Sequence, residues 1–138
     1  MYFLDTTTCI YFLNGTSESI KHKLLATPPK EIVVPAVVKA ELLFGAYKSR
    51  NRSDNIDKVE MFLKPFRLIP FDAEACYRYA EIRFKCEIHG TAVGPNDLCI
   101  AATVSAHNGI LVTHNTKEFK LIEDLRIEGL RLEDWVLG

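Results

Sequence analysis

Three acidic residues stand in apolar surroundings, where a carboxylate needs a partner. Asp5 follows the apolar opening of the chain, Glu41 lies inside the apolar run 37–44, and Asp97 precedes the apolar run 98–102. A buried charge without a partner costs several kcal/mol, and neighbouring carboxylates raise one another's pKa. A divalent cation removes both penalties, and oxygen ligands without a set of His or Cys residues favour Mg²⁺ or Mn²⁺ over zinc. The sequence therefore predicts a metal site built from these three acids.

Each of these acids also has an ordinary structural explanation. Asp97, near the start of a helix, is able to act as a cap or as a partner of the helix dipole. Asp5, followed by threonines, is also typical of a turn after a strand. Glu41 is also compatible with the solvent-exposed face of a helix. Convergence of all three on one place in the fold would distinguish a metal site from three separate structural roles.

The elements that must position these acids alternate along the chain. Short apolar, β-branched segments predict strands, and segments with helical spacing of apolar residues separate them. This alternation predicts an α/β fold, a three-layer α/β/α sandwich with a central parallel sheet, in a single domain over residues 1–138. The predicted strands are 2–4, 31–34, 67–70, 110–113 and 130–132. The predicted helices lie between Thr6 and Asn14 and at 17–26, 35–47, 56–63, 73–89 and 95–106, with 114–119 as a loop or short helical turn.

Two segments far apart in the sequence end strands of this sheet. In a doubly wound sheet, ligands lie beyond the carboxyl ends of the strands, where the strand order reverses. Asp5 follows the first predicted strand, and the segment Thr113–Asn115 closes a later one. Because parallel strands place their carboxyl ends at one edge, we expect these two segments to meet.

Composition and charge narrow the class of protein. The chain has 138 residues, 48% hydrophobic and 25% charged, with a net charge of −1, as in an ordinary globular domain. The apolar opening is cut off by Asp5, and no apolar run approaches the ~20 residues that a bilayer requires. The four cysteines form no C-x-x-C pair, which favours buried, reduced thiols over a zinc site. We therefore expect a cytoplasmic protein without membrane association.

Four stretches of the sequence occur together, in the same order and spacing, in one known family. The sequence resembles PIN-domain proteins, specifically VapC-type toxins of type II toxin–antitoxin pairs, over essentially its whole length. The stretches are Leu4-Asp5-Thr6-Thr7, Ala40-Glu41-Leu42-Leu43-Phe44-Gly45, Gly94-Pro95-Asn96-Asp97-Leu98-Cys99-Ile100-Ala101-Ala102, and Leu111-Val112-Thr113-His114-Asn115-Thr116-Lys117-Glu118-Phe119 with Leu132-Glu133-Asp134-Trp135.

The resemblance implies an activity, a cofactor and partners. It implies an endoribonuclease that depends on Mg²⁺, with Mn²⁺ able to substitute. It also implies a cognate antitoxin that neutralises this activity, and a homodimer, which is common among relatives. Asp5, Glu41 and Asp97 match the family's three core acids. By this resemblance, Asp5 and Asp97 are direct metal ligands and Glu41 binds metal or orients the attacking water.

The fourth acid is where this sequence departs from many relatives. They have an aspartate at the position of Asn115, and Glu118 is the alternative that completes the site. Thr6 and Thr113 are expected to support the ligands. Thr7 stands where the family usually has Asn or Ser. His114 occupies a position that is often Asn in the family, and we expect it either to contact the RNA or to be a loop residue without a role in function.

Basic residues offer possible contacts for the RNA backbone. Lys48, Arg50 and Arg52 follow the helix of Glu41, and Lys117 and Lys120 follow the strand that ends at Thr113. A solvated charged loop explains each group equally well.

Two other classes of function compete with a nuclease. A PIN-like RNA-binding or scaffold module with weak catalysis is one alternative, although such a module is expected to lack a core acid. A phospho-acceptor domain of the response-regulator type is the other, but the order of acids along this chain does not supply its set of residues.

Overall fold

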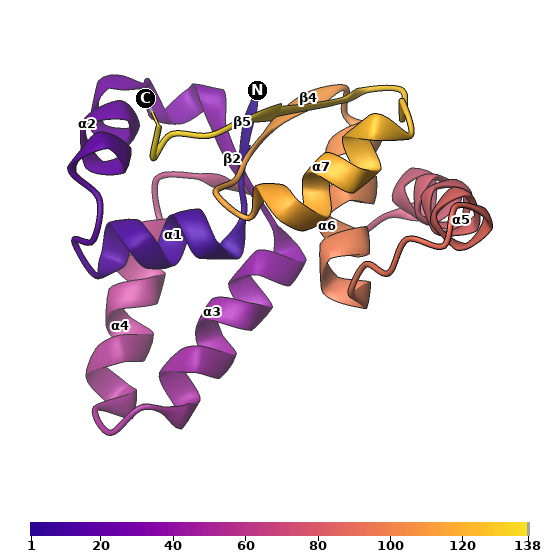
Figure 1. The fold of residues 1–138 in the computed structure, drawn as a ribbon. Coiled ribbons are helices and arrows are strands. Elements are labelled where there is room, and N and C mark those ends of the chain that lie inside the picture. Colours follow the sequence, from indigo (N-terminus) through magenta and orange to yellow (C-terminus); the bar gives the residue numbers. More distant parts are fainter. Residues whose placement is uncertain (138) are drawn as a thin grey trace.

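The structure, a computed structural model, describes residues 1–137 and has a five-stranded parallel sheet at its centre. The strands are β1 (Tyr2–Leu4), β2 (Ile32–Pro35), β3 (Arg67–Ile69), β4 (Gly109–Val112) and β5 (Leu130–Glu133). Helices cover both faces of the sheet (Figure 1). The helices are α1 (Thr6–Leu13), α2 (Glu18–Ala26), α3 (Ala36–Lys48), α4 (Arg52–Leu63), α5 (Ala73–Ile88), α6 (Pro95–Ala106) and α7 (Thr116–Asp124), with a short 3₁₀ turn at Pro29–Glu31. The predicted three-layer α/β/α architecture is confirmed.

The strand order is β3-β2-β1-β4-β5, so the order reverses between β1 and β4. From β1 the chain moves to β2 and β3 on one side, and from β4 it moves to β5 on the other. The connections on the two sides therefore diverge at the carboxyl ends of β1 and β4, which is where ligands bind in sheets of this kind. The register pairs Leu4 with Val112, which brings Asp5 and Thr113 to the same edge as predicted.

The three central strands and one helix form the core. The side chains of Phe3, Leu4, Val33, Leu111 and Val112 are at most 1% exposed, as expected for strands covered on both faces. Helix α6 is buried on nearly every side, from Leu98 and through 100–105. A helix that is apolar all round belongs in the interior, so the carboxylate in its first turn is held against a rigid support.

Helices α3 and α4 form a hairpin that extends away from the sheet (Figure 1). Pro35 ends β2 and is the N-cap residue of α3, and Val38, Leu42 and Ala46 form the buried side of this helix at spacings of four residues. Glu41 therefore lies near the base of the hairpin, and Lys48 lies at its tip.

The structure corrects some of the predicted boundaries. Residues 116–119 of the segment 114–119, expected as a loop or short helical turn, form the first turn of helix α7, which continues to Asp124 because Phe119 and Ile122 are both fully buried at helical spacing. Helix α4 begins at Arg52, four residues before the predicted start at Ile56, because its first turn is polar and carries no apolar signal. Cys76 is exposed, whereas the sequence predicted buried thiols at all four cysteines.

Across residues 1–137, none of the helices combines the length and apolar character that crossing a bilayer requires.

Candidate active site

Asp5 is a buried carboxylate at the point where the strand order reverses. It is 3% exposed, its backbone N–H donates to the Val112 carbonyl at 3.2 Å, and its Oδ1 accepts a hydrogen bond from the Thr8 N–H at 2.8 Å. Burial raises the pKa of Asp5, while hydrogen bonds from Thr113 and Thr8 lower it. The carboxylate caps helix α1 and is joined to the ends of β1 and β4 at the same time.

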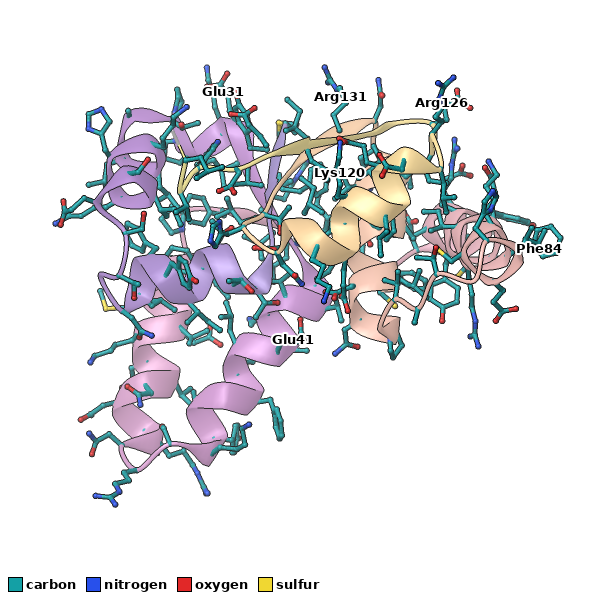
Figure 2. All side chains as sticks on the ribbon, in the orientation of Figure 1. Glu31, Glu41, Phe84, Lys120, Arg126 and Arg131 are labelled. Atoms are coloured by element: carbon teal, nitrogen blue, oxygen red, sulfur yellow. The ribbon has the colours of Figure 1, made fainter. Side chains whose placement is uncertain are left out.

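Glu41 joins three segments that are distant in the sequence. Its Oε1 accepts a hydrogen bond from the Thr6 hydroxyl at 2.6 Å, and its Oε2 accepts one from the Asn96 amide at 3.2 Å. Figure 2 shows Glu41 on α3, near the start of α6. Both carboxylate oxygens are thus held in place by the first residues of α1 and α6. The sequence singled out Thr6 and missed Asn96, although Asn96 precedes Asp97 directly.

Asp97 lies against Glu118, and its pKa is strongly raised. Burial raises the pKa of Asp97 to about 8, assisted by the hydrogen bond that the protonated Asp97 carboxyl donates to Glu118 and by the negative charges of Glu118, Glu41 and Asp5. Asp97 lies in the first turn of α6 and Glu118 in the first turn of α7. The four carboxyl groups therefore interact, and three acids predicted from scattered positions converge with Glu118 at one place.

Thr113 and Asn115 shape the loop between β4 and α7. Thr113 is fully buried, and its Oγ1 accepts a hydrogen bond from the Asn115 N–H at 2.9 Å. Asn115 is the N-cap residue of α7, and its side chain makes no capping hydrogen bond. Of the two alternatives for the fourth acidic position, Glu118 is the one that contacts Asp97.

His114 is paired with an acid that sequence reasoning did not select. Its Nδ1 lies 2.9 Å from Asp134 Oδ2, and its ring lies 5.8 Å from the ring of Tyr11. The Asp134 carboxylate also accepts a hydrogen bond from the Val136 N–H at 2.9 Å. His114 is therefore held between α1 and the end of β5, and a role in catalysis remains a prediction.

The basic residues proposed as RNA contacts are partly engaged with neighbours. Lys48 Nζ lies 4.5 Å from the centre of the Phe44 ring, and Arg52 Nε donates to the Tyr47 carbonyl at 2.9 Å, both at the tip of the α3–α4 hairpin. Lys120 lies 3.1 Å from Glu123 and 3.7 Å from Asp124. The first group therefore lies at the far end of the hairpin from Glu41, away from the acids.

The donor chemistry of the acids fits a hard divalent cation. Within the described part of the chain, no three His, Cys, Asp or Glu side chains are already arranged in metal-ligand geometry. The raised pKa of Asp97 instead favours a proton on that carboxyl, which eases the repulsion among the acids, and hydrogen bonds from Thr6 and Asn96 hold Glu41. A cation would replace that proton and bring together oxygen ligands of the kind that Mg²⁺ and Mn²⁺ prefer.

Two hollows border the acids from opposite sides. The first, which we call the apolar groove, has a volume of about 300 Å³ and lies between α1, α3 and α4; its lining includes Ile10, Leu13, Leu42, Ala46, Val59 and Glu41. The second, which we call the polar cavity, has a volume of about 530 Å³ and lies between α5, the connection 91–94, α6 and α7; its lining includes Tyr79, Arg83, Glu87, Thr91, Pro95 and Glu118. Each hollow therefore has one of the acids in its wall.

Comparisons with known proteins agree on a single family. Residues 2–125 match the PIN domain. The chain is 38% identical to Ribonuclease VapC2 of Rickettsia felis, over 98% of each chain. It is 31% identical to the tRNA(fMet)-specific endonuclease VapC of Salmonella typhimurium, over 97% of each chain.

Solved structures give the same result. The structure of VapBC2 from Rickettsia felis bound to a promoter DNA fragment superimposes with a TM-score of 0.86 at 38% identity, covering 97% of this chain and 98% of that one. DNA-bound VapBC from Salmonella typhimurium superimposes with a TM-score of 0.87 at 31% identity, covering 97% of each chain.

Proposed function

The chain belongs to the PIN-domain family and, within it, to the VapC ribonucleases, and on this basis we propose that it is a metal-dependent endoribonuclease toxin held inactive by a cognate antitoxin. It hydrolyses phosphodiester bonds of RNA. The observation that carries the proposal is the convergence of Asp5, Glu41, Asp97 and Glu118 where the strand order reverses. Four interacting carboxyl groups, one of them with its pKa raised to about 8, have little structural purpose without a cation.

Asp5, Asp97 and Glu41 are the proposed ligands of Mg²⁺, with Mn²⁺ able to substitute, and Glu118 completes the acidic set. A bound cation would lower the pKa of the attacking water and offset the charge that develops on the phosphate. The chain itself fixes the ligands. The Thr8 N–H and the Thr113 hydroxyl orient Asp5, while Thr6 and Asn96 orient the two oxygens of Glu41.

Glu118 has a separate role in this proposal. It lies against Asp97 in the first turn of α7, and its negative charge and its hydrogen bond from the protonated Asp97 carboxyl help to raise the pKa of Asp97. A bound cation would reverse this effect, because positive charge favours the ionised form of Asp97. Glu118 therefore supports Asp97 electrostatically, and we keep Asn115 as a supporting residue of the loop.

We place the antitoxin in the apolar groove. Proteins similar to this chain have been solved as VapBC complexes, so an antitoxin partner is expected here too. Such partners wrap apolar segments around the toxin, and the groove offers Ile10, Leu42 and Val59 for such a segment. Glu41 lies in the same groove, where an arginine from the partner would meet a carboxylate. A homodimer remains a prediction, which the mass of the purified protein in solution would test.

RNA is the proposed substrate, and transfer RNA is the first to test, because one relative is a tRNA(fMet)-specific endonuclease. The purified chain, freed of antitoxin, should cleave RNA with Mg²⁺ or Mn²⁺ and stop in EDTA. Asp5→Asn should abolish cleavage while the circular dichroism spectrum and RNA affinity stay unchanged. Cleavage that continues in EDTA would rule out the metal mechanism. RNA binding without cleavage under all metal conditions would favour the weakly catalytic binding module instead.

A further inference from the structure

The polar cavity is left unused by the chemistry proposed above. Its volume of about 530 Å³ lies within the ~300–1,000 Å³ typical of small-molecule sites. Glu118 forms one wall, and Pro95 and Leu98 come from the same helical turn as Asp97. Because Glu118 also lies against Asp97, the cavity borders the acids through Glu118. A ligand in the cavity would therefore lie next to the reacting phosphate.

Tyr79 and Arg83 form a prepared surface in this cavity. The Tyr79 ring packs edge-on against Phe71, with 6.0 Å between ring centres and an interplanar angle of 90°. The Tyr79 hydroxyl accepts a hydrogen bond from Arg83 Nη1 at 3.2 Å, and Arg83 Nε donates to Glu87 at 3.4 Å. The guanidinium is thus held between two neighbours on α5, and its remaining N–H groups are free to bind a ligand.

The charges in the cavity favour a base over a phosphate. Arg83 is the cation among its lining residues, whereas Glu87 and Glu118 both bring carboxylates. A phosphate would be attracted by one of these groups and repelled by two. A nucleobase has donors for a carboxylate, acceptors for a guanidinium, and a flat face for a tyrosine ring or a guanidinium plane.

We propose that the polar cavity binds the unpaired nucleobase of an RNA nucleotide next to the scissile phosphate, with Arg83 and Tyr79 as the residues that recognise it. This inference rests on the proposed ribonuclease function, because it needs single-stranded RNA at the acids. Unpaired bases stack on aromatic or arginine planes and are read at their edges, and the cavity provides both kinds of contact. Arg83 and Tyr79 then select the cleavage site rather than take part in the chemistry.

The test uses the full-length protein and a short fluorescein-labelled single-stranded RNA in EDTA, with affinity measured by fluorescence anisotropy. A set of otherwise identical RNAs carries one abasic nucleotide, moved along the strand. At one position, loss of the base should weaken binding to the unsubstituted protein by about tenfold. Arg83→Gln should weaken binding of the intact RNA by a similar factor and should make that abasic position indistinguishable from the others.

Arg78→Gln is the matched control. It removes the same charge from the same helix, where Arg78 pairs with Glu74 at 3.5 Å, and Arg78 does not line the cavity. It should leave the abasic profile of the unsubstituted protein intact. Tyr79→Phe keeps the ring and removes the hydroxyl that positions Arg83, so it should give an intermediate loss.

Several results would overturn the inference. One is an abasic profile that is flat in the unsubstituted protein, and another is a profile that Arg83→Gln does not change. If Arg83 instead contacted a phosphate, Arg83→Gln would lower the number of phosphate charges indicated by the salt dependence of RNA binding by about one. The abasic profile would then show no loss at any single base position. If Arg83→Gln weakened only the antitoxin complex, the cavity would be a protein contact.

Cleavage in Mn²⁺, measured on the same RNAs, separates this inference from the proposed function. If the inference alone fails, the unsubstituted protein and Arg83→Gln cleave with equal KM. If the nuclease function alone fails, no RNA is cleaved, yet the abasic profile and its loss in Arg83→Gln remain. Arg83→Gln should otherwise raise KM about tenfold with little change in kcat, because base binding precedes the chemical step.

Discussion

The apolar groove and the polar cavity differ in the kind of ligand that each can bind. The groove has a wall of aliphatic side chains from α1, α3 and α4, such as Leu13, Leu42 and Val59. The cavity has a guanidinium, a tyrosine and carboxylates from α5 and α7. An apolar peptide segment gains from burial in the groove, whereas a nucleobase finds donors, acceptors and a stacking surface in the cavity.

The two hollows nevertheless meet at the same acids, through Glu41 on one side and Glu118 on the other. A partner in the groove reaches the acids without having to fill the cavity. We therefore expect the antitoxin to inhibit by neutralising the acids, while the site for the nucleobase stays open. Substitutions in one hollow should then leave the function of the other largely intact, and those at the acids should affect catalysis most strongly.

Asp97→Asn should have the largest effect, because Asp97 lies between the hollows and belongs to neither. Loss of an outer-sphere partner of a metal typically costs ~10–100-fold, so we expect loss of a ligand to reduce the cleavage rate by more than about 100-fold. Affinity for RNA in EDTA and for the antitoxin should change little. Asp124→Asn, a surface acid on the same helix as Glu118, is the control. Cleavage near the normal rate in Asp97→Asn would remove Asp97 from the ligand set.

Thr6→Val tests how the acid at the groove is held. It removes the hydroxyl that donates to Glu41 at 2.6 Å while keeping the shape of the side chain. We expect the cleavage rate to fall by ~10–100-fold and the antitoxin affinity to stay the same. Thr6→Ser restores the donor and should recover most of the rate. A fully active Thr6→Val protein would show that the hydrogen bond to Glu41 is dispensable for catalysis.

Gly45→Leu blocks the groove without touching the acids. Gly45 lines the groove, and a Cβ added there meets no atom within 4 Å, so the larger side chain should enter the space meant for the partner. We expect antitoxin affinity, measured by calorimetry, to fall about tenfold or more, equivalent to ~1.4 kcal/mol, with RNA cleavage unchanged. Gly45→Ala is the control, and it should stabilise the helix by ~0.5–1 kcal/mol without weakening the complex. Equal antitoxin affinity in Gly45→Leu would place the partner elsewhere.

The acid pair at the cavity predicts an unusual dependence of stability on pH. The folded-state pKa of Asp97 is raised from 3.8 to about 8, so the folded protein retains a proton that the unfolded chain loses. Stability in EDTA should therefore decrease as the pH rises through this window, with a slope of at most ~1.4 kcal/mol per pH unit. Asp97→Asn should flatten the decrease, as measured by urea denaturation from pH 4 to pH 8. An identical slope in Asp97→Asn would contradict the raised pKa of Asp97.

Much of the fold followed from local patterns. Alternating β-branched strands and helices with apolar spacing predicted the parallel sheet, and the placement of Asp5 and Thr113 after strands predicted their meeting at one edge. These predictions succeed because period-two and period-3.6 patterns depend on neighbours in the sequence. The start of α4 and the extent of α7 were predicted wrongly. The first turn of α4 is polar, and the buried residues of α7, Phe119 and Ile122, were too few to indicate a full helix.

The sequence by itself singled out the residues that we propose to carry the chemistry: Asp5, Glu41 and Asp97 were identified from carboxylates in apolar surroundings and from the family motifs, together with Glu118 and the supporting threonines. Only the tertiary structure decided how these residues act on one another. It placed Glu118 against Asp97, attached Glu41 to Thr6 and Asn96, and paired His114 with Asp134. It also formed both hollows, because each is the space left where helices from distant parts of the chain pack together. Such contacts depend on long-range packing, and no local pattern in the sequence records them.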